Sequence, residues 1–172
     1  MRWEEVPLSD SLTIRTHFGD LSVSWEGNCL VGVAFGDYAP EEVITRVTSG
    51  NAQRENDDVV QGLIAYFQGD REALVGLSQV PAGSAFQMDV WRATLEIPFG
   101  ETQSYGYVAD RLGRDRGVSR AVGLALGQNP LPLIVPCHRV IGANGDLTGF
   151  GGGLGWKRAL LGFEVPQFSL AL

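Results

Sequence analysis

The segment Leu131–Val140 reads LPLIVPCHRV and places a cysteine next to a histidine, between prolines and an apolar run. The chain of 172 residues contains only 2 cysteines and 2 histidines, so adjacent Cys137 and His138 are a notable coincidence. Such a pair can act as nucleophile and base. Buried structural cysteines are nevertheless common, and the dipeptide alone favours that simpler interpretation.

The composition is that of a globular protein of one domain, or of a small domain packed on a second. Hydrophobic residues make up 44% of the chain and charged residues 19%. No apolar run is long enough to cross a bilayer, and the acidic N-terminus MRWEEVPLSD lacks the apolar core of a signal peptide. We therefore expect a cytoplasmic protein with no membrane partner. Its reducing surroundings argue against a disulfide between Cys29 and Cys137.

The charge is unevenly distributed along the chain. Residues 1–80 contain 5 basic and 13 acidic side chains, whereas residues 81–172 contain 8 basic and 7 acidic ones. The overall charge of −7 thus comes from the first half, and Arg111–Arg120 holds four arginines against one acid. The net charge does not exclude a nucleic-acid partner, although such a run is often only solvated surface.

The first half predicts an α+β arrangement. Alternating apolar and polar residues over 11–36, interrupted by two turns, predict a three-stranded antiparallel meander. Helices are expected at about Pro40–Val47, with acids in the first turn, and at about Asp57–Phe67. Residues 69–83 are expected to form a loop with at most one short strand.

No catalytic constellation is visible in this half of the chain. Trp25 and Phe35 are most simply core residues. Cys29 and His17 could suggest zinc, but a structural zinc site usually needs four ligands with close paired spacing. We expect no metal.

The second half is predominantly helical. Ser84–Gln87 fits a capping box, and the helix that follows should end at Pro98–Gly100. Apolar spacing predicts a helix over 103–112 and another at about Val118–Gln128, joined by a turn rich in glycine and arginine. This pair fits a DNA-binding helix-turn-helix, or equally an ordinary helical hairpin.

The helix expected at about Val118–Gln128 is thin on one side, because Ala121, Gly123, Ala125 and Gly127 are small. Small residues let a helix approach another surface closely. That surface is either a packed neighbour or the narrow minor groove of DNA. Arg120 stands near the start of this helix, where it can reach into a base stack.

The remaining segments surround the Cys-His pair. Asn129–Pro132 is a rigid break, after which Leu133–Val135 is expected to be a short buried strand. A glycine-rich loop over 142–155 follows. The last helix is expected at about Leu154–Phe163, immediately before Glu164.

Residues 84–164 resemble the O6-alkylguanine-DNA alkyltransferase family, also called methylated-DNA–protein-cysteine methyltransferases. The resemblance is carried by PCHRV at 136–140 together with PFGETQSY at 98–105, SRAVG at 119–123, NP at 129–130, and GGL at 152–154 with Lys157. It implies an α+β fold, with residues 1–80 as a supporting domain built on a small antiparallel sheet with helices (RNase H-like). Residues 84–172 would be a mainly helical DNA-binding and alkyl-transfer domain with a helix-turn-helix.

The resemblance also implies a reaction. The Cys137 thiolate would attack the alkyl carbon of O6-alkylguanine in DNA, and also that of O4-alkylthymine, once per protein molecule. His138 would take the thiol proton through a water molecule and would be oriented by Glu164, following the logic of a catalytic triad. Tyr105 would protonate or hydrogen-bond the leaving guanine. No cofactor is implied.

The DNA partner implied by the resemblance is a duplex bound through its minor groove by a monomer, with the damaged nucleotide flipped out. Arg120 would fill the vacated space, while Asn129 and Arg139 would support the site. Further DNA contacts would come from Ser119, Ala121, Gly123 and Tyr105. The base pocket would be lined by Leu126, Pro132, Val140, Phe150 and Gly151.

Two positions depart from the family pattern. Gly151 stands where many members have a serine that helps to hold O6, and Phe150 stands where a phenol is found. These departures bear on rate and substrate range. They do not affect the chemistry that the resemblance implies, because Cys137, His138, Tyr105 and Glu164 are all present.

Two other functions remain as alternatives. A non-catalytic helix-turn-helix protein or lesion binder would not need Cys137, since lesion-binding relatives typically carry tryptophan at that position. A cysteine hydrolase would usually draw its nucleophile and base from distant segments, unlike the adjacent Cys137 and His138.

Overall fold

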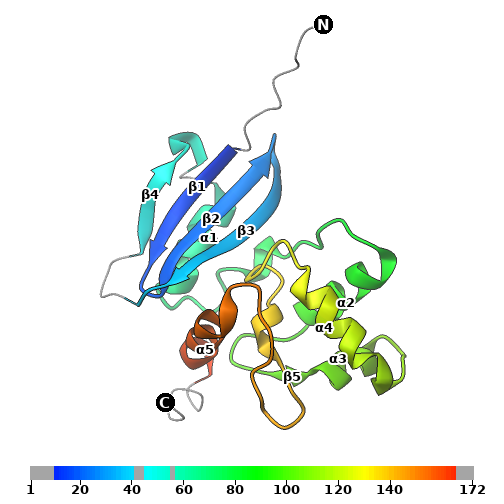
Figure 1. The fold of residues 1–172 in the computed structure, drawn as a ribbon. Coiled ribbons are helices and arrows are strands. Elements are labelled where there is room, and N and C mark those ends of the chain that lie inside the picture. Colours follow the sequence, from blue (N-terminus) through cyan, green and yellow to red (C-terminus); the bar gives the residue numbers. More distant parts are fainter. Residues whose placement is uncertain (1–9, 41–44, 55–56, 166–172) are drawn as a thin grey trace, which may run out of the picture.

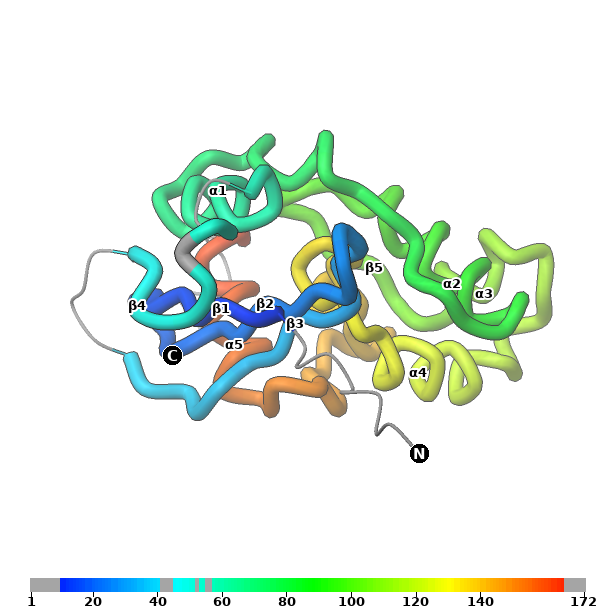
Figure 2. Tube along the Cα trace, turned by 90° about the horizontal axis from the view of Figure 1, so that it is seen from above, coloured from blue at the N-terminus to red at the C-terminus, as the bar shows by residue number. Residues whose placement is uncertain are grey.

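The computed structural model describes residues 10–40, 45–54 and 57–165. Figures 1 and 2 both place the sheet with α1 and α5 on one side of the molecule, and α2, α3 and α4 on the other. The strands are β1 (Asp10–Thr16), β2 (Gly19–Glu26), β3 (Cys29–Tyr38), β4 (Arg46–Gly50), β5 (Gln103–Ser104) and β6 (Val140–Ile141). The α-helices are α1 (Asp58–Phe67), α2 (Ala85–Leu95), α3 (Tyr105–Arg111), α4 (Ser119–Gly127) and α5 (Gly153–Glu164). Short 3₁₀ helices are η1 (Ala52–Arg54), η2 (Val75–Leu77), η3 (Arg116–Val118) and η4 (Cys137–Arg139).

The antiparallel sheet has the strand order β3-β2-β1-β4. Its first three strands form the meander that the alternating pattern predicts. Leu12, Ile14, Leu21, Val23 and Trp25 all point to the buried face, as period-two alternation requires. The mixed α+β class expected from the sequence is therefore confirmed.

The helix predicted at Pro40–Val47 is wrong in its described part. Arg46 and Val47 belong to β4, which pairs with β1 through Arg15↔Arg46 and Ile14↔Val47, while residues 41–44 lie outside the described residues. The segment 43–48 is rich in β-branched residues, which favour strands over helices. The strand propensity of these residues outweighs the helix signal of Glu41 and Glu42, which precede them in the sequence. Residues 69–83 hold the 3₁₀ helix η2 rather than a strand.

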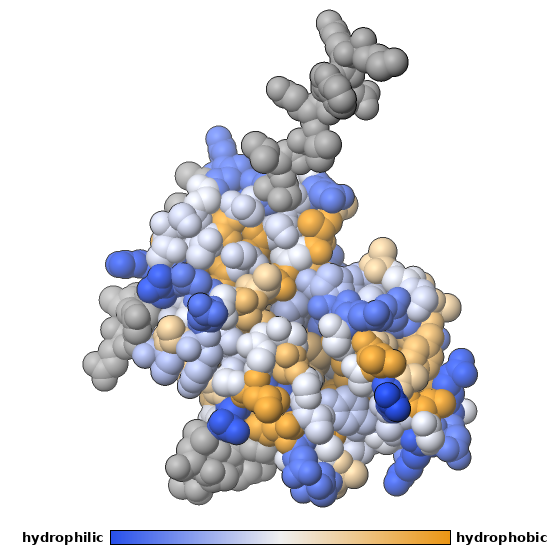
Figure 3. Space-filling view, in the orientation of Figure 1, coloured by the Kyte–Doolittle hydropathy of each residue, from blue (hydrophilic) through white to orange (hydrophobic). Residues whose placement is uncertain are grey.

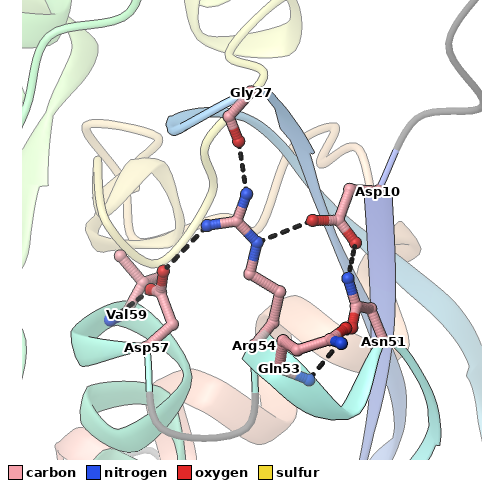
Figure 4. A network of polar contacts seen from close by, with 7 residues as sticks. All are labelled: Asp10, Gly27, Asn51, Gln53, Arg54, Asp57 and Val59. Atoms are coloured by element: carbon pink, nitrogen blue, oxygen red, sulfur yellow. Dashed lines mark hydrogen bonds and ion pairs between the residues drawn. The ribbon is translucent and has the colours of Figure 1, made fainter.

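A polar network around Arg54 connects one end of the sheet to α1 (Figure 4). The Arg54 guanidinium donates to the Asp10 carboxylate at 2.7 Å and to the Gly27 carbonyl, and lies 3.7 Å from Asp57. Asn51 donates to the same Asp10 carboxylate at 2.9 Å. Because Asp57 is also the N-cap of α1, the network ties the start of β1, the β2–β3 turn and this helix together.

The helices of the second half follow the predicted pattern, with small shifts at their ends. Ser84 caps α2 in a capping box, as expected. The Trp91 indole donates to the carbonyl of Ala125 at 3.0 Å and so binds α2 to α4. Glu164 is the last residue of α5 rather than the residue after it.

Two hydrophobic cores organise the molecule. The first joins the sheet to α1 and α5, and the second joins α2, α3 and α4. Leu131, Leu133 and Ile134 belong to the first core, whereas Val135 and Cys137 belong to the second. The segment Leu131–Val140 therefore passes from one core into the other. The division into domains 1–80 and 84–172 stays a prediction.

The strand predicted at Leu133–Val135 is wrong. The segment makes only an isolated bridge between Pro132 and Val135, and Leu133 has a φ of 75°, in the left-handed region. The turn is closed by the Val135 N–H, which donates to the Leu131 carbonyl at 2.8 Å. These apolar residues are buried because they fill the space between two cores, so their burial does not require a sheet.

The edge strand β3 is attached directly to the second half. The Val33 N–H donates to the carbonyl of Pro130 at 2.9 Å, and the Trp156 indole of α5 donates to the carbonyl of Gly36 at 2.8 Å. These bonds place β3 beside the loop that precedes Cys137.

The surface shows no large continuous apolar area on the face of Figure 3, where hydrophobic residues form separate patches among hydrophilic ones. Among the residues that the structure describes, no helix is long and apolar enough to span a membrane.

Candidate active site

Cys137 opens the 3₁₀ helix η4 and is 7% exposed. Its N–H donates to the Val135 carbonyl at 2.8 Å, and its Sγ lies 3.3 Å from Nδ2 of Asn129. Burial raises the pKa of the Cys137 thiol, while the Asn129 donor and the positive charge of Lys157 oppose that rise. The thiol therefore needs a base to become a nucleophile at neutral pH.

The Asn129 amide organises the turn that presents this sulfur. Besides contacting Sγ, its Nδ2 donates to the Val135 carbonyl at 2.9 Å, and its Oδ1 accepts from the Leu131 N–H at 3.0 Å. One side chain thus fixes both ends of the turn and points a donor at Cys137. The supporting role expected for Asn129 stays a prediction.

His138 is fully buried, and its Nε2 lies 2.9 Å from Oε1 of Glu164. Burial lowers the pKa of His138 despite the nearby Glu164 carboxylate, so the imidazole is neutral at pH 7. The hydrogen-bond network assigns the proton to Nε2, which donates to Glu164. Nδ1, left as an acceptor, has no hydrogen-bond partner among the described residues.

Glu164 accepts hydrogen bonds from several segments of the chain. The Arg139 guanidinium donates to both carboxylate oxygens, at 2.7 and 2.9 Å, and the Tyr66 hydroxyl donates to Oε1 at 2.6 Å. Burial acts to raise the pKa of Glu164, but His138 and Arg139 outweigh burial and hold the pKa well below its usual range. Glu164 is therefore a fixed negative charge behind His138.

Tyr66 is a member of this network that sequence reasoning missed. It lies on α1, and burial together with the Glu164 charge raises the pKa of its hydroxyl. Tyr66 and Glu164 are 98 positions apart, so no local spacing links them. A tyrosine on the apolar face of a helix carries only the signal of a core residue.

A cavity of about 190 Å³ lies in front of Cys137. Four of the five residues predicted to form a base pocket line it: Leu126, Pro132, Phe150 and Gly151. Val140 does not; it is buried, and its carbonyl accepts from the Lys157 ammonium at 2.8 Å. The sequence did not reveal that β3 supplies another part of the wall through Val33, Ala34 and Phe35.

Tyr105 does not line this cavity, and its ring centroid lies 5.9 Å from the Lys157 ammonium, whose charge acts on Cys137. It follows β5, whose parallel pairing with β6 sets Ser104 opposite Ile141, just beyond the Cys-His pair. The Tyr105 hydroxyl accepts from Thr148 Oγ1 at 3.0 Å, which leaves its own proton free to be donated. Lys157 bridges the same region, since it donates to the Thr148 carbonyl at 3.0 Å, and burial lowers its pKa to about 8.

Most of the basic run Arg111–Arg120 is engaged locally. Arg111 forms an ion pair with Glu96, the C-cap of α2, and Arg116 forms one with Asp110 of α3. Arg114 lies over a phenylalanine ring. Ser119 donates to the Arg116 carbonyl at 2.6 Å. Arg120 is exposed at the start of α4 and makes no ion pair within the described part of the chain.

The small residues of α4 serve two different surfaces. Gly123 faces the Tyr105 ring, where an added Cβ would lie 3.6 Å from the ring edge, as in ordinary packing. Ala121 and Gly127 instead lie on the exposed face, together with Arg120 and with Leu124, which is 65% exposed. This face is solvent-accessible and unusually poor in polar side chains for a surface helix.

Both cysteines are free thiols, with Cys29 exposed and Cys137 buried. Within residues 10–40, 45–54 and 57–165, no three His, Cys, Asp or Glu side chains are grouped so as to hold a metal ion. His17, considered above with Cys29, packs against the aromatic rings of Phe18, Phe67 and Phe163.

A buried thiol with an amide donor at its sulfur is followed by a neutral histidine held by a carboxylate, and these are the kinds of group that a cysteine nucleophile uses. Comparison with known proteins specifies the class further. Residues 85–165 match the family model described as 6-O-methylguanine DNA methyltransferase, DNA binding domain. A methylated-DNA–protein-cysteine methyltransferase of Mycobacterium tuberculosis is 45% identical over 90% of this chain and 92% of that protein.

Solved structures agree with the sequence comparison. The crystal structure of Mycobacterium tuberculosis O6-methylguanine methyltransferase has a TM-score of 0.68 and 38% identity, covering 91% of this chain and 93% of that one. Mycobacterium tuberculosis OGT in complex with DNA has a TM-score of 0.66 and 37% identity, covering 92% and 96% of the two chains. The chain belongs to the methylated-DNA–protein-cysteine methyltransferase family.

Proposed function

We propose that the protein repairs DNA by direct reversal, with Cys137 accepting the alkyl group from O6-alkylguanine, and from O4-alkylthymine, in duplex DNA. The observation that carries this proposal is that Cys137 lines a cavity of about 190 Å³ whose walls include Leu126, Pro132, Phe150 and Gly151. Ligand pockets for drug-sized molecules measure roughly 300–1,000 Å³. The smaller cavity suits one flipped base with a short alkyl substituent.

The reaction begins with removal of the thiol proton. In this proposal His138 accepts it at Nδ1 through a water molecule, since Nδ1 is the ring nitrogen that Glu164 does not engage. The Asn129 amide and the Lys157 charge then stabilise the thiolate, because both act to lower the pKa of Cys137. Glu164, kept anionic, stabilises the imidazolium that forms.

The transfer step forms a bond between Cys137 Sγ and the alkyl carbon and breaks the bond between that carbon and O6. The electron pair of the broken bond goes to the guanine, which takes up a proton as it leaves. Tyr105 supplies this proton, because its hydroxyl accepts from Thr148 and keeps its own hydrogen for donation. The thioether product is not reversed by thiols, so each molecule acts once.

The DNA surface is α4, with α3 and η3 completing a helix-turn-helix. The exposed Ala121 and Gly127 let α4 approach the floor of the minor groove, while Arg120 occupies the space left by the flipped nucleotide. Ser119, Gly123 and Tyr105 complete the contact region. The relative solved in complex with DNA supports a DNA partner. We propose that the protein binds DNA as a monomer.

Gly151 and Phe150 define how this site would differ from the family pattern. Phe150 retains an aromatic face on the cavity wall without a hydroxyl, and Gly151 contributes no side chain there. The O6 atom would then be held by a backbone N–H of the glycine loop rather than by a serine hydroxyl.

A cytoplasmic location, where thiols stay reduced, would keep Cys137 available.

The test is a single-turnover assay with duplex DNA containing O6-methylguanine. We expect loss of the lesion to end at one equivalent of protein and one methyl group to appear on the peptide that contains Cys137. Exposed Cys29 is the internal control and should stay unmodified. Cys137→Ser should bind the duplex without repairing it.

The alternatives give different results in the same assay. A hydrolase would turn over many times, and a lesion binder would leave the methyl group on the DNA. Loss of the lesion with unmodified Cys137 would overturn the proposal.

A further inference from the structure

The strand β3 forms one wall of the cavity that contains Cys137. Val33, Ala34 and Phe35 lie on the same cavity as Cys137 and Phe150, although they precede the cysteine by about a hundred positions. Phe35 is the bulkiest of the three. The sheet of the first half is therefore part of the site as well as its support.

Phe35 is wedged between two aromatic residues of the second half. Its ring centroid lies 5.2 Å from that of Phe150 and 4.7 Å from that of Trp156, both in tilted arrangements. Such pairs stabilise one another beyond simple burial. Because Phe35 contacts Phe150, its ring fixes the position of the aromatic face that the base would meet.

The glycine-rich loop packs closely against the Phe35 ring at Gly152. A Cβ added at Gly152 would lie 2.5 Å from the Phe35 ring, closer than real side chains come. The neighbouring Gly151, which lines the cavity, has no such neighbour within 4 Å. Gly152 therefore packs against Phe35, whereas Gly151 faces the cavity.

The backbone of β3 is held as firmly as its side chains. The Val33 N–H donates to the Pro130 carbonyl at 2.9 Å, and Pro130 lies between Asn129 and Pro132, which both line the cavity. The wall therefore cannot withdraw when a larger group enters without breaking this bond or the aromatic packing.

We propose that Phe35 determines which alkyl groups the protein accepts, by limiting the room beside Cys137. This inference rests on the proposed alkyl transfer and adds a specificity-determining residue from outside the helical half. Removing the Phe35 ring leaves a space of about the size of a phenyl group. Bulky O6 substituents such as benzyl then fit, while the methyl group gains nothing.

The experiment compares transfer of benzyl and methyl groups from O6-benzylguanine and O6-methylguanine in the same duplex. Single-turnover rate constants are measured for the wild type, Phe35→Ala and Phe35→Leu. We expect the benzyl-to-methyl rate ratio to rise about tenfold in Phe35→Ala, and less in Phe35→Leu, given the usual effect of pocket size on specificity. If Phe35→Ala does not fold, Phe35→Leu decides.

Tyr38→Leu is the matched control. Tyr38 lies on the same strand and packs against Trp156 and Gly155, but it does not line the cavity. The ratio should stay at the wild-type value in this variant. An unchanged ratio in both Phe35 variants, or an equal rise in Tyr38→Leu, would overturn the inference. Failure of the wild type to transfer either group to Cys137 would instead overturn the proposed function.

Discussion

At the scale of single residues, the orientation of His138 depends on the hydrogen bonds that hold Glu164. Its carboxylate accepts hydrogen bonds from His138 and Arg139 of η4 and from Tyr66 of α1. A buried carboxylate is costly unless such partners surround it. The three donors together keep it charged and fixed, and through it they set the orientation of His138.

Tyr66→Phe tests the contribution of the first half to this network. Removing the hydroxyl takes a 2.6 Å hydrogen bond from Oε1 of Glu164 and adds no bulk. We expect a loss of about 1.5–3 kcal/mol in the free energy of unfolding, measured by urea denaturation, as for hydrogen bonds to charged groups. Tyr38→Phe, on a residue that is 45% exposed, is the control and should change stability little. Equal effects of the two substitutions would contradict the role given to Tyr66.

At the scale of elements, the contact between β3 and the end of the glycine-rich loop explains two of the glycines there, Gly152 and Gly155. Gly152 meets Phe35, and a Cβ at Gly155 would lie 2.8 Å from the Tyr38 ring. The aromatic residues of one strand and the glycines of α5 and its preceding loop are therefore complementary. The sequence of β3 alone does not explain its aromatic residues, and the sequence of the loop alone does not explain these glycines.

Gly152→Ala tests this complementarity. The added methyl group would overlap the Phe35 ring, so the loop must move away from β3. We expect a loss of about 1–3 kcal/mol in unfolding free energy, which is typical of overpacking. Gly151→Ala is the neighbouring control, because nothing lies within 4 Å of its Cβ position. If the two substitutions destabilise the protein equally, close packing on Phe35 is not the reason for Gly152.

At the scale of the whole molecule, Leu131–Val140 joins two cores and carries buried titratable groups at their junction. Burial lowers the pKa of His138 below its ordinary value of 6.5, and burial lowers the pKa of His17 as well. The pKa of Glu164 is held below its ordinary value of 4.5. In each case the unfolded chain binds a proton more readily than the folded one, so acid favours unfolding.

The expected pH dependence follows from these directions. The contribution of His138 is fully present above pH 6.5 and is lost as the pH falls toward its lower folded pKa; that of Glu164 is lost below pH 4.5. The free energy of unfolding, measured by urea denaturation, should therefore be lower at pH 5.5 than at pH 7.5, mainly because of the buried His138 and to a smaller extent because of the half-buried His17. His138→Gln, which can still donate to Glu164, should show only the smaller fall due to His17. A flat profile in the wild type would contradict the buried neutral state of His138.

Local sequence patterns predicted much of this molecule because they report short-range physics. The period-two alternation of 11–36 gave the meander, and the Ser84 capping box gave the start of α2. The same patterns misled at Pro40–Val47, where acids suggested a helix but β-branched residues pair as β4. They also misled at Leu133–Val135, where an apolar run fills the space between two cores rather than joining a sheet.

For the site, the sequence by itself predicted Cys137 as the nucleophile together with the groups around it, because PCHRV at 136–140, Asn129 and Glu164 all lie in the half that resembles the alkyltransferase family. It also identified four residues of the cavity wall, Leu126, Pro132, Phe150 and Gly151. Only the tertiary structure revealed that Tyr66 donates a hydrogen bond to Glu164 and that Phe35 lines the cavity. It also showed that the four arginines of residues 111–120 differ. Within the described residues, three of them have an ion pair or an aromatic ring as a partner, and Arg120 has neither. These relationships join residues that are distant along the chain or depend on which surface neighbours meet. They arise from packing between elements, and no pattern within a single segment encodes such packing.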